Sequence, residues 1–479
     1  MNFVRRDPLS DSHTMINRAT FIAASLFPVI AALVVAGCSS EDAGPGPSGG
    51  GDGVTSGGGP ASGGVSGMDP LPGGGTNFGT GGDTASGGIS GTGGVDGSGG
   101  GTGEDFDCVL PDLPEASQLP DLGMKLPDPF TFYDGTKVTT RAQWECRRKE
   151  ILAMAAKYLY GPVPGEPDEV TGTVSGGTVN INVTVGSKTE SFTASISGSG
   201  DVIALRLDNS GIAPQGSKSL SLGSGNEAKI ANLFGISGVN RNIAIGWMID
   251  RVMDVLEANP SSGHDPTKIM VTGCSGCGKG AFLAGVFSRV PLTVIVESGG
   301  GGATSWRMTQ WFRSGQGNWS CGDLPQGIGD LEDTGICGPW VTSAAQPFRS
   351  NPALVNHLPF DQHLLIATIA PRYLVHFTNN NGSGSWCHLA GTSEALAAWA
   401  AYPVYEALGV PERMSFEVYT GSHCGTPDTG IAAAMFDRAF NGNMSADTGG
   451  VRIQDSRVQQ PVSQWPSTWI DWDMDTVLQ

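Results

Sequence analysis

The stretch KIMVTGCSGCGKGAFLAGVFS, residues 268–288, decides how this chain is expected to fold. Its short apolar start predicts a buried strand, its glycines predict a turn, and its small and apolar second half predicts a helix. Ser275 lies in the turn, between Cys274 and Gly276. A serine at a strand-to-helix turn is typical of an activated nucleophile, because such a turn exposes the hydroxyl above the carboxyl edge of a sheet.

Two other interpretations of this turn stand beside a nucleophile. A phosphate-binding loop has the pattern G-x-x-x-x-G-K-[ST], in which the residue after the lysine supplies a hydroxyl group. Gly273, Gly278 and Lys279 fit that pattern, but Gly280 stands where the hydroxyl is required. Ser275 could also be one more small residue in a turn without chemistry. The rest of the sequence has to decide among these interpretations.

The sequence before residue 104 differs in composition from the rest. Residues 1–38 contain an apolar stretch from Phe21 to Ala36 and end in Val-Ala-Gly-Cys, which resembles a bacterial lipobox. This resemblance implies cleavage before Cys38 and lipidation of that cysteine. A transmembrane anchor is the alternative, although the apolar run is short for a span. Residues 39–103 are rich in glycine and serine and hold almost no apolar side chains, so we expect a disordered linker.

Residues 104–479 are long enough to bury one large core. If Cys38 carries lipid, the protein is exported and anchored at the cell envelope, at the outer membrane or cell surface, with no other membrane contact. The formal net charge is −19, which argues against nucleic acid as a partner. We expect a monomer.

The cysteines beyond Cys38 indicate disulfides, because an even number in an exported chain favours pairing. They are Cys108, Cys146, Cys274, Cys277, Cys321, Cys337, Cys387 and Cys424. Their pairing does not follow from their spacing. A zinc site is not indicated, because the one C-x-x-C pair has no second pair at zinc spacing.

Strand and helix patterns alternate along residues 104–479. VNINVTV and ESFTASIS, residues 179–185 and 190–197, predict a β-hairpin. Residues 243–259 predict a helix with one apolar face formed by Ile245, Ile249, Val252 and Leu256. Other apolar runs predict strands at 201–209, 268–273, 291–298, 370–380 and 414–425, and a helix at 393–409. The alternation indicates an α/β fold with a mostly parallel central sheet, helices on both faces and the hairpin at its start.

Three reactive side chains fall at the carboxyl ends of three predicted strands: Ser275, Glu297 and His423. Ligands gather at that edge of a parallel sheet. The chain order of serine, acid and histidine is that of α/β-hydrolases. A histidine can take the proton of the serine, and a buried carboxylate holds the imidazole in the required tautomer. We therefore predict an α/β-hydrolase three-layer sandwich that uses these three residues.

Each member of this set has a rival. Glu297 could be a solvated strand end, but the competing acid position after residues 370–378 offers only asparagines. His388, in a loop beside Trp386, is the main rival of His423. His423 is favoured because it follows the last predicted strand. A bond between Cys274 and the cysteine after His423 would also place the histidine beside the serine.

Several motifs occur in one order along the chain. They are WECRRKEILAMAAKYLYGPVP, GWMIDRVMDVLE, DPTKIMVTGCSGCGKGAF, VESGGGGATSWR, LPFDQHLLIATIAPR, YEALGVPERMSF and GSHC. The third resembles the G-C-S-R-x-G-K-x-A nucleophile motif of glucuronoyl esterases, carbohydrate esterase family 15, and the others resemble that family in the same order. The resemblance covers roughly residue 108 to the last helix.

The resemblance implies the roles of the site residues. It implies Ser275 as nucleophile, Glu297 as acid and His423 as base. It implies disulfides that join Cys274 to Cys424 and Cys108 to Cys146. Lys279 matches the family lysine that contacts sugar hydroxyls, and Trp386 looks like the family tryptophan that lines the uronic-acid pocket. Each residue also has an alternative without a binding role: Lys279 could be a solvated lysine on a helix, and Trp386 could pack its own loop.

One departure from the family matters. Gly276 stands where the family has an arginine directly after the serine, so the backbone N–H of Gly276 is the predicted oxyanion donor. Losing one oxyanion donor costs about 10²–10³ in rate in other enzymes. The chain could be slow, take a cation from another loop, or act on a different ester. Cys277 is also unusual: it could pair with Cys387, and Cys321 could pair with Cys337.

The resemblance implies a serine esterase that cleaves the ester between (4-O-methyl-)glucuronic acid of glucuronoxylan and lignin alcohols, without a metal or organic cofactor. A second hypothesis is a serine esterase for another carbohydrate or aryl ester. A third is a surface lipoprotein that binds glycan with weak or no turnover. The intact set of serine, acid and histidine argues against the third hypothesis, and the missing arginine argues for it.

Overall fold

The computed structural model describes residues 106–331, 335, 337–379, 387–389, 391–425, 427 and 429–479. The predicted signal peptide (1–38) and linker (39–103) lie outside the described residues. Within the described part of the chain, we find no helix long and apolar enough to cross a membrane.

One ten-stranded sheet organises the described residues, in the order β1-β2-β3-β5-β4-β6-β7-β8-β9-β10. The strands are β1 (Glu169–Ser175), β2 (Thr178–Val185), β3 (Lys188–Ser197), β4 (Ile203–Arg206), β5 (Lys218–Leu222), β6 (Ile269–Cys274), β7 (Leu292–Val296), β8 (Tyr373–Asn379), β9 (Met414–Tyr419) and β10 (Val451–Arg452). Pairing is antiparallel from β1 to β5 across β2 and β3, and parallel from β5 to β10. The predicted hairpin is therefore confirmed as β2 and β3, at the antiparallel end of a mostly parallel sheet.

Burial differs between the two parts of the sheet. Every residue of β6 and β7 is buried, whereas exposed and buried residues alternate along most of β2 and β3. Helices cover both faces of the parallel strands, so those strands are apolar on both sides, while the hairpin has one face in water. This difference explains why the sequence shows a continuous apolar run in residues 269–271 and alternation in residues 179–185.

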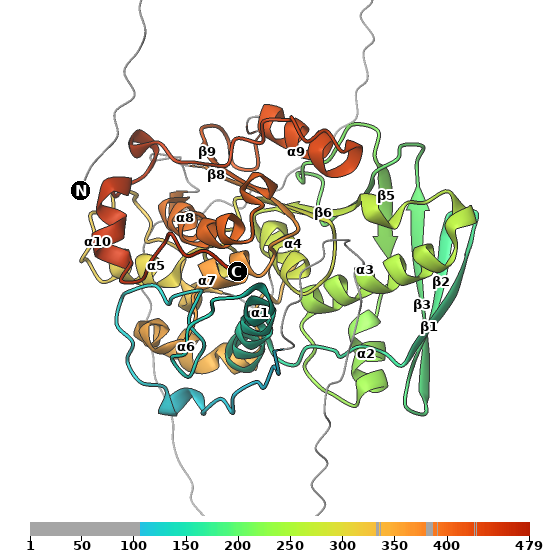
Figure 1. Cartoon of the computed structure of the whole chain (residues 1–479), viewed down its shortest axis with the longest axis horizontal. Helices are drawn as coiled ribbons and strands as arrows, with labels where there is room; N and C mark the ends of the chain where they lie inside the picture. The colour runs from blue at the N-terminus through green and yellow to red at the C-terminus, as the bar shows by residue number, and fades with distance from the viewer. Residues whose placement is uncertain are drawn as a thin grey trace, which may run out of the picture. The chain divides into compact units, whose positions relative to one another are not determined.

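Helices flank the sheet as predicted (Figure 1). One face packs against α3 (Arg241–Ala258), α4 (Gly276–Val286) and α8 (Gly391–Ala407), and the other packs against α9 (Thr429–Asn441). The described residues form six further α-helices: α1 (Arg141–Ala155), α2 (Asn226–Phe234), α5 (Trp306–Arg313), α6 (Gln346–Ser350), α7 (Gln362–Ala367) and α10 (Trp465–Trp469). The α/β-hydrolase three-layer sandwich is confirmed.

The last predicted strand differs from the structure in two ways. The strand predicted at 414–425 ends at Tyr419, and β10 follows it, so it is not the last strand. The strand ends early because residues 420–425 turn away to form the loop that carries His423. The aromatic segment near the carboxyl end packs on the domain, and its Trp465 and Trp469 are fully buried.

Candidate active site

Ser275 sits in a tight turn between β6 and α4. Its backbone has φ 57° and ψ −123°, a strained conformation for a residue with a side chain. The turn closes because glycines flank it. A Cβ on Gly273 would lie 2.3 Å from the carbonyl oxygen of Cys277, and one on Gly278 would lie 2.6 Å from that of Val296. The glycines that suggested a phosphate loop thus allow close packing of a strained strand-to-helix turn of the kind that carries the nucleophile in α/β-hydrolases.

Gly276 begins α4 directly after the serine. The first N–H groups of a helix have no partner within it and carry partial positive charge. The predicted oxyanion donor, the Gly276 N–H, is therefore part of a helix N-terminus. The Gly276 carbonyl accepts a hydrogen bond from Trp340 Nε1 at 2.8 Å, which holds the peptide that follows Gly276 in one orientation.

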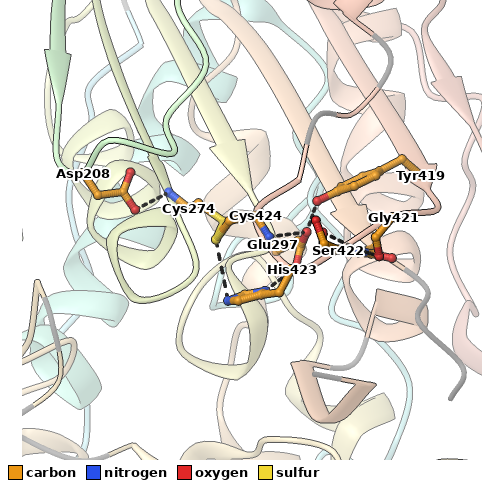
Figure 2. The surroundings of a disulfide bond; sticks show 9 residues. Asp208, Cys274, Glu297, Tyr419, Gly421, Ser422, His423 and Cys424 are labelled. Carbon is orange, nitrogen blue, oxygen red and sulfur yellow. Dashed lines mark hydrogen bonds and ion pairs between the residues drawn. A yellow bond between two sulfur atoms is a disulfide. The ribbon is translucent and has the colours of Figure 1, made fainter. Parts of the chain in front are cut away.

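A disulfide joins the serine turn to the histidine loop. Cys274 and Cys424 are bonded, with their Cα atoms 5.8 Å apart, so the bond brings together the residues adjacent to Ser275 and His423 (Figure 2). Asn379, at the end of β8, supports the same loop through hydrogen bonds from its Nδ2 to the carbonyls of Gly421 (3.0 Å) and Ser422 (3.2 Å). The asparagine at the rival acid position therefore holds the loop that carries the histidine.

Glu297 is the carboxylate that meets His423. Its Oε2 lies 2.5 Å from His423 Nδ1. Its Oε1 accepts hydrogen bonds from the Tyr419 hydroxyl and, at 3.1 Å, from the Cys424 N–H. Glu297 is 2% exposed and also has positive φ, 46°. The alternative of a solvated strand end is wrong, because this carboxylate is buried and fully engaged by hydrogen-bond donors.

Lys279 lies one helical turn beyond the serine. It is 2% exposed, and its Nζ lies 5.0 Å from the centroid of the Trp340 ring. Burial lowers the pKa of Lys279 to about 8, against the opposing charge of Glu394. A solvated helix lysine is excluded, since this ammonium is enclosed beside an aromatic face.

Glu394, on α8, lies close enough to influence Lys279. Burial alone would raise the pKa of Glu394, but the nearby His376 imidazole, whose Nε2 lies 3.7 Å from Glu394 Oε1, and hydroxyl groups lower it. The Ser298 hydroxyl and the Gly299 N–H each donate to its Oε1 at 2.6 Å. Glu394 therefore carries negative charge next to Ser298 and Gly299, the residues that directly follow Glu297.

The disulfide predictions meet different outcomes. The Cys274–Cys424 and Cys108–Cys146 bonds are confirmed. The pairings of Cys277 with Cys387 and of Cys321 with Cys337 are wrong, because Cys277 is bonded to Cys337. Cys321 is also disulfide-bonded. Folding brings residues 337–340 onto the start of α4, where Asn242 Nδ2 donates to the Cys337 carbonyl at 3.1 Å, and this approach is not visible in the spacing of the cysteines.

The other predicted site residues fall in two groups. Trp386 lies outside the described residues, and so does the side chain of Cys387. Three other histidines have structural contacts: His376 is buried in β8, His357 Nδ1 lies 2.9 Å from the Leu119 carbonyl, and His363 Nε2 lies 2.8 Å from the Pro127 carbonyl. Burial lowers the pKa of His363 to about 4.

A metal centre has one candidate cluster in the described part of the chain. Cys274, His423 and Cys424 bring potential ligand atoms within 4.8 Å of one another. Both sulfurs, however, belong to the disulfide. A disulfide sulfur is not a thiolate, and the thiolate is the form that binds metal. The cluster therefore does not fit a metal ion.

Three residues of the site were missed in the sequence: Asp208, Trp340 and Tyr419. Asp208 carried a usable signal, because it lies near the end of the strand predicted at 201–209. Tyr419 lies in the middle of the strand predicted at 414–425, and only the early end of β9 places it at the sheet edge. Trp340 carried no signal. It reaches the serine turn only through the fold and through the Cys277–Cys337 bond.

Comparison with known proteins identifies the family. The family model described as "Glucuronyl esterase, fungi" matches residues 171–409. A 4-O-methyl-glucuronoyl methylesterase from Schizophyllum commune is 34% identical over 382 residues, covering 74% of this chain and 91% of that protein. The chain belongs to the glucuronoyl esterase family. It is a carboxylic ester hydrolase, and the expected resemblance is confirmed.

Solved structures agree with this assignment. The glucuronoyl esterase catalytic domain Cip2_GE from Hypocrea jecorina superposes with a TM-score of 0.63 at 31% identity, covering 76% of this chain and 100% of that one. A mutant glucuronoyl esterase from Sporotrichum thermophile, in complex with methyl 4-O-methyl-β-D-glucopyranuronate, has a TM-score of 0.59 at 29% identity. It covers 76% of this chain and 98% of that chain.

The two confirmed disulfides allow a matched test of the site. Replacing Cys274 and Cys424 together by alanine should lower kcat/KM for a glucuronate ester by 10-fold or more, because the serine and histidine loops lose their tether. Replacing Cys108 and Cys146 together should leave kcat/KM within about 2-fold. Removal of either disulfide by such a double substitution should lower the free energy of unfolding by about 2–5 kcal/mol.

Ester hydrolysis and urea unfolding, measured on both double variants, check this prediction. Equal losses of kcat/KM in the two variants would show that the Cys274–Cys424 bond acts on stability alone.

Proposed function

We propose that Ser275, His423 and Glu297 form the catalytic triad of a serine esterase that cleaves glucuronoyl esters through an acyl-enzyme. The observation that carries the proposal is the 2.5 Å contact between Glu297 Oε2 and His423 Nδ1, at the carboxyl edge of the sheet and beside the strained serine turn. This contact leaves Nε2 of the imidazole as the atom that faces the reaction.

In the proposed acylation, Ser275 Oγ attacks the uronic carbonyl carbon while His423 Nε2 takes the serine proton. The tetrahedral intermediate then collapses, the bond to the alcohol oxygen breaks, and the imidazolium protonates the leaving alcohol. In deacylation, His423 takes a proton from water, the resulting hydroxide attacks the acyl carbon, and Ser275 leaves with the proton. The Glu297 carboxylate, in contact with His423 Nδ1, stabilises the imidazolium in both steps.

The oxyanion in this proposal faces the start of α4. The Gly276 N–H and the positive end of the helix dipole stabilise the developing negative charge. The family arginine would add a formal charge at this point, and Gly276 does not. We infer that the chain relies on backbone donors for the oxyanion, which is consistent with a slow member of the family.

Lys279 is proposed to bind hydroxyl groups of the uronic-acid sugar. A buried ammonium beside Trp340 offers hydrogen-bond donors in a place shielded from water. The complex of the Sporotrichum thermophile mutant with a methyl glucuronate ester supports this substrate class. Trp386 is proposed as a further wall of the sugar site.

The proposed natural substrate is the ester between (4-O-methyl-)glucuronic acid on glucuronoxylan and a lignin alcohol. The esterified carboxyl group is neutral, so the chain's net charge of −19 does not repel it. A serine esterase for another carbohydrate or aryl ester is the second candidate, favoured by the absence of the arginine. No nucleic acid is proposed as a partner.

We also propose that the protein is exported as a monomer and held at the cell envelope by lipid on Cys38, with residues 39–103 as a flexible linker to an esterase domain of residues 104–479. The lipobox-like Val-Ala-Gly-Cys sequence supports this proposal.

Lipidation at Cys38 is tested by expression with radiolabelled palmitate, which should label the wild-type protein and leave the Cys38→Ala variant unlabelled. Equal labelling of both would exclude lipidation at Cys38.

The esterase proposal is tested with benzyl glucuronate. The wild-type protein should release benzyl alcohol, and Ser275→Ala should lower kcat by at least about 10³-fold, because the nucleophile is lost. Ser314→Ala, in the exposed turn after α5, is the control and should keep full activity. A folded wild-type protein without hydrolysis would overturn the glucuronoyl specificity and direct the search to other esters.

The role of Lys279 predicts opposite effects on binding and stability. Lys279→Met should raise KM for benzyl glucuronate by about 10-fold or more, because hydrogen bonds from a charged donor are lost. It should also raise the free energy of unfolding near pH 7 by on the order of 1–3 kcal/mol, since a buried charge is removed. The exposed Lys137→Met is the control and should change neither quantity appreciably.

The sign of the pH dependence follows from the lowered pKa of Lys279. Between about pH 8 and 10.5 the folded wild-type protein binds fewer protons at Lys279 than the unfolded chain does. Wild-type stability should therefore rise relative to Lys279→Met over this range. Urea unfolding of both proteins at pH 7 and pH 10 measures this change in relative stability. A Lys279→Met variant that loses both binding and stability would show that the lysine is a structural element.

A further inference from the structure

Asp208 is a carboxylate at the active site that the triad does not use. It follows β4, which pairs directly with the nucleophile strand β6. The pairing continues past the end of β4, because the Leu207 N–H donates to the Thr272 carbonyl at 3.0 Å. Asp208 Oδ2 then accepts a hydrogen bond from the Cys274 N–H at 3.3 Å. The carboxylate therefore holds the residue immediately before Ser275.

A local role as a cap does not account for the whole carboxylate. Asp208 Oδ1 is buried and has no hydrogen-bond partner in the described part of the chain. Burial raises the pKa of Asp208, and the nearby amides of Cys274, Ser210 and Gly211 oppose that rise. One acceptor oxygen would suffice for the bond to Cys274, and an asparagine would supply it without a buried charge.

The charge of Asp208 acts on His423. Figure 2 shows that Asp208 and Glu297 approach the Cys274–Cys424 disulfide from opposite sides. His423 lies against that disulfide, with its Nε2 3.6 Å from Cys424 Sγ. Burial raises the pKa of Asp208, and the electrostatic interaction with His423 is among the effects that oppose this rise.

The groups that face His423 come from three elements. Glu297 follows β7 and meets Nδ1, Tyr419 ends β9 and donates to Glu297, and Asp208 follows β4 and lies beyond the disulfide. Two of these groups are carboxylates. An imidazolium at His423 therefore has negative charge on two sides.

We propose that Asp208 is a positioning residue that clamps the nucleophile turn through Cys274 and stabilises the imidazolium of His423 as a second carboxylate. This inference rests on the triad of the proposed function. The proton that His423 takes from Ser275 creates positive charge on the imidazole. Asp208 stabilises that charge without touching the substrate and without exchanging a proton itself.

The substitution of glycine after the serine gives Asp208 particular weight in this chain. An arginine at position 276 would place a cation on the residue directly after Ser275. Gly276 places none there. Among the described residues no lysine or arginine forms an ion pair with Asp208, so its charge is available to the imidazole.

The charge of Asp208 can be removed without removing its hydrogen bond. Asp208→Asn keeps an oxygen that accepts from the Cys274 N–H. Asp265→Asn is the matched control. Asp208 bonds the end of β6, and Asp265 caps the turn before the start of β6 through a 2.9 Å hydrogen bond from the Thr267 N–H. The His423 imidazole is titrated by NMR in each full-length protein, with its resonance assigned by comparison with His423→Gln.

In Asp208→Asn the titration midpoint of the His423 resonance should fall by about half a pH unit, because the imidazolium loses a stabilising charge. The acid limb of kcat/KM for benzyl glucuronate should move to lower pH by the same amount, and kcat on the plateau should fall about 3–10-fold. Asp265→Asn should leave all three quantities unchanged.

An unchanged His423 midpoint in folded Asp208→Asn would overturn the proposal, whatever happens to kcat. A loss of kcat without a shift would show that Asp208 only holds the turn. If Asp208→Asn does not fold, Asp208→Ser keeps a hydroxyl acceptor and is titrated in its place. The NMR titration does not need turnover, so a wild-type protein inactive on benzyl glucuronate sinks the proposed substrate and leaves this test intact.

Discussion

The bond between Cys274 and Cys424 is the constraint on which the active site depends. It joins residues that are 150 positions apart in the sequence, and it places the serine turn against the histidine loop. Cys274 is the last residue of β6, but Cys424 lies in the loop beyond the end of β9, so the sheet alone does not determine the spacing of the two segments. That spacing is determined by the covalent bond, by the hydrogen bonds of Asn379 and by the hydrogen bond from the Cys424 N–H to Glu297.

Strain is concentrated at this junction. Ser275, Glu297, Cys337 and Cys424 are the residues other than glycine with positive φ in the described part of the chain. Two are proposed triad members and the other two belong to disulfides that hold the serine turn. Such conformations persist only where the surroundings over-determine them. Here the buried sheet edge, the disulfides and the hydrogen bonds supply that over-determination.

The electrostatics of the candidate site differ from what the family resemblance implies, because Gly276 stands where an arginine was expected after the serine. The described residues near the reacting atoms provide carboxylates, a helix N-terminus and one buried lysine. In the proposed mechanism, Glu297 and Asp208 favour an imidazolium, and the start of α4 favours an oxyanion. Lys279 lies enclosed beside Trp340. The proposal thus assigns each charge of the transition state to a different element of the fold, and the oxyanion receives only partial charges.

The sequence by itself determined the α/β class, the hairpin, the central strands and the positions of Ser275, Glu297 and His423. Those features are local: they follow from hydrophobic periodicity, glycine turns and the end of each strand. The family resemblance also identified two disulfides. The tertiary structure decided the Cys277–Cys337 bond, the place of Trp340 on the serine turn, the burial of Lys279 and the approach of Asp208 to Cys274. These depend on which segments meet across the sheet edge, because contacts between residues distant in the chain leave no periodic signal in it.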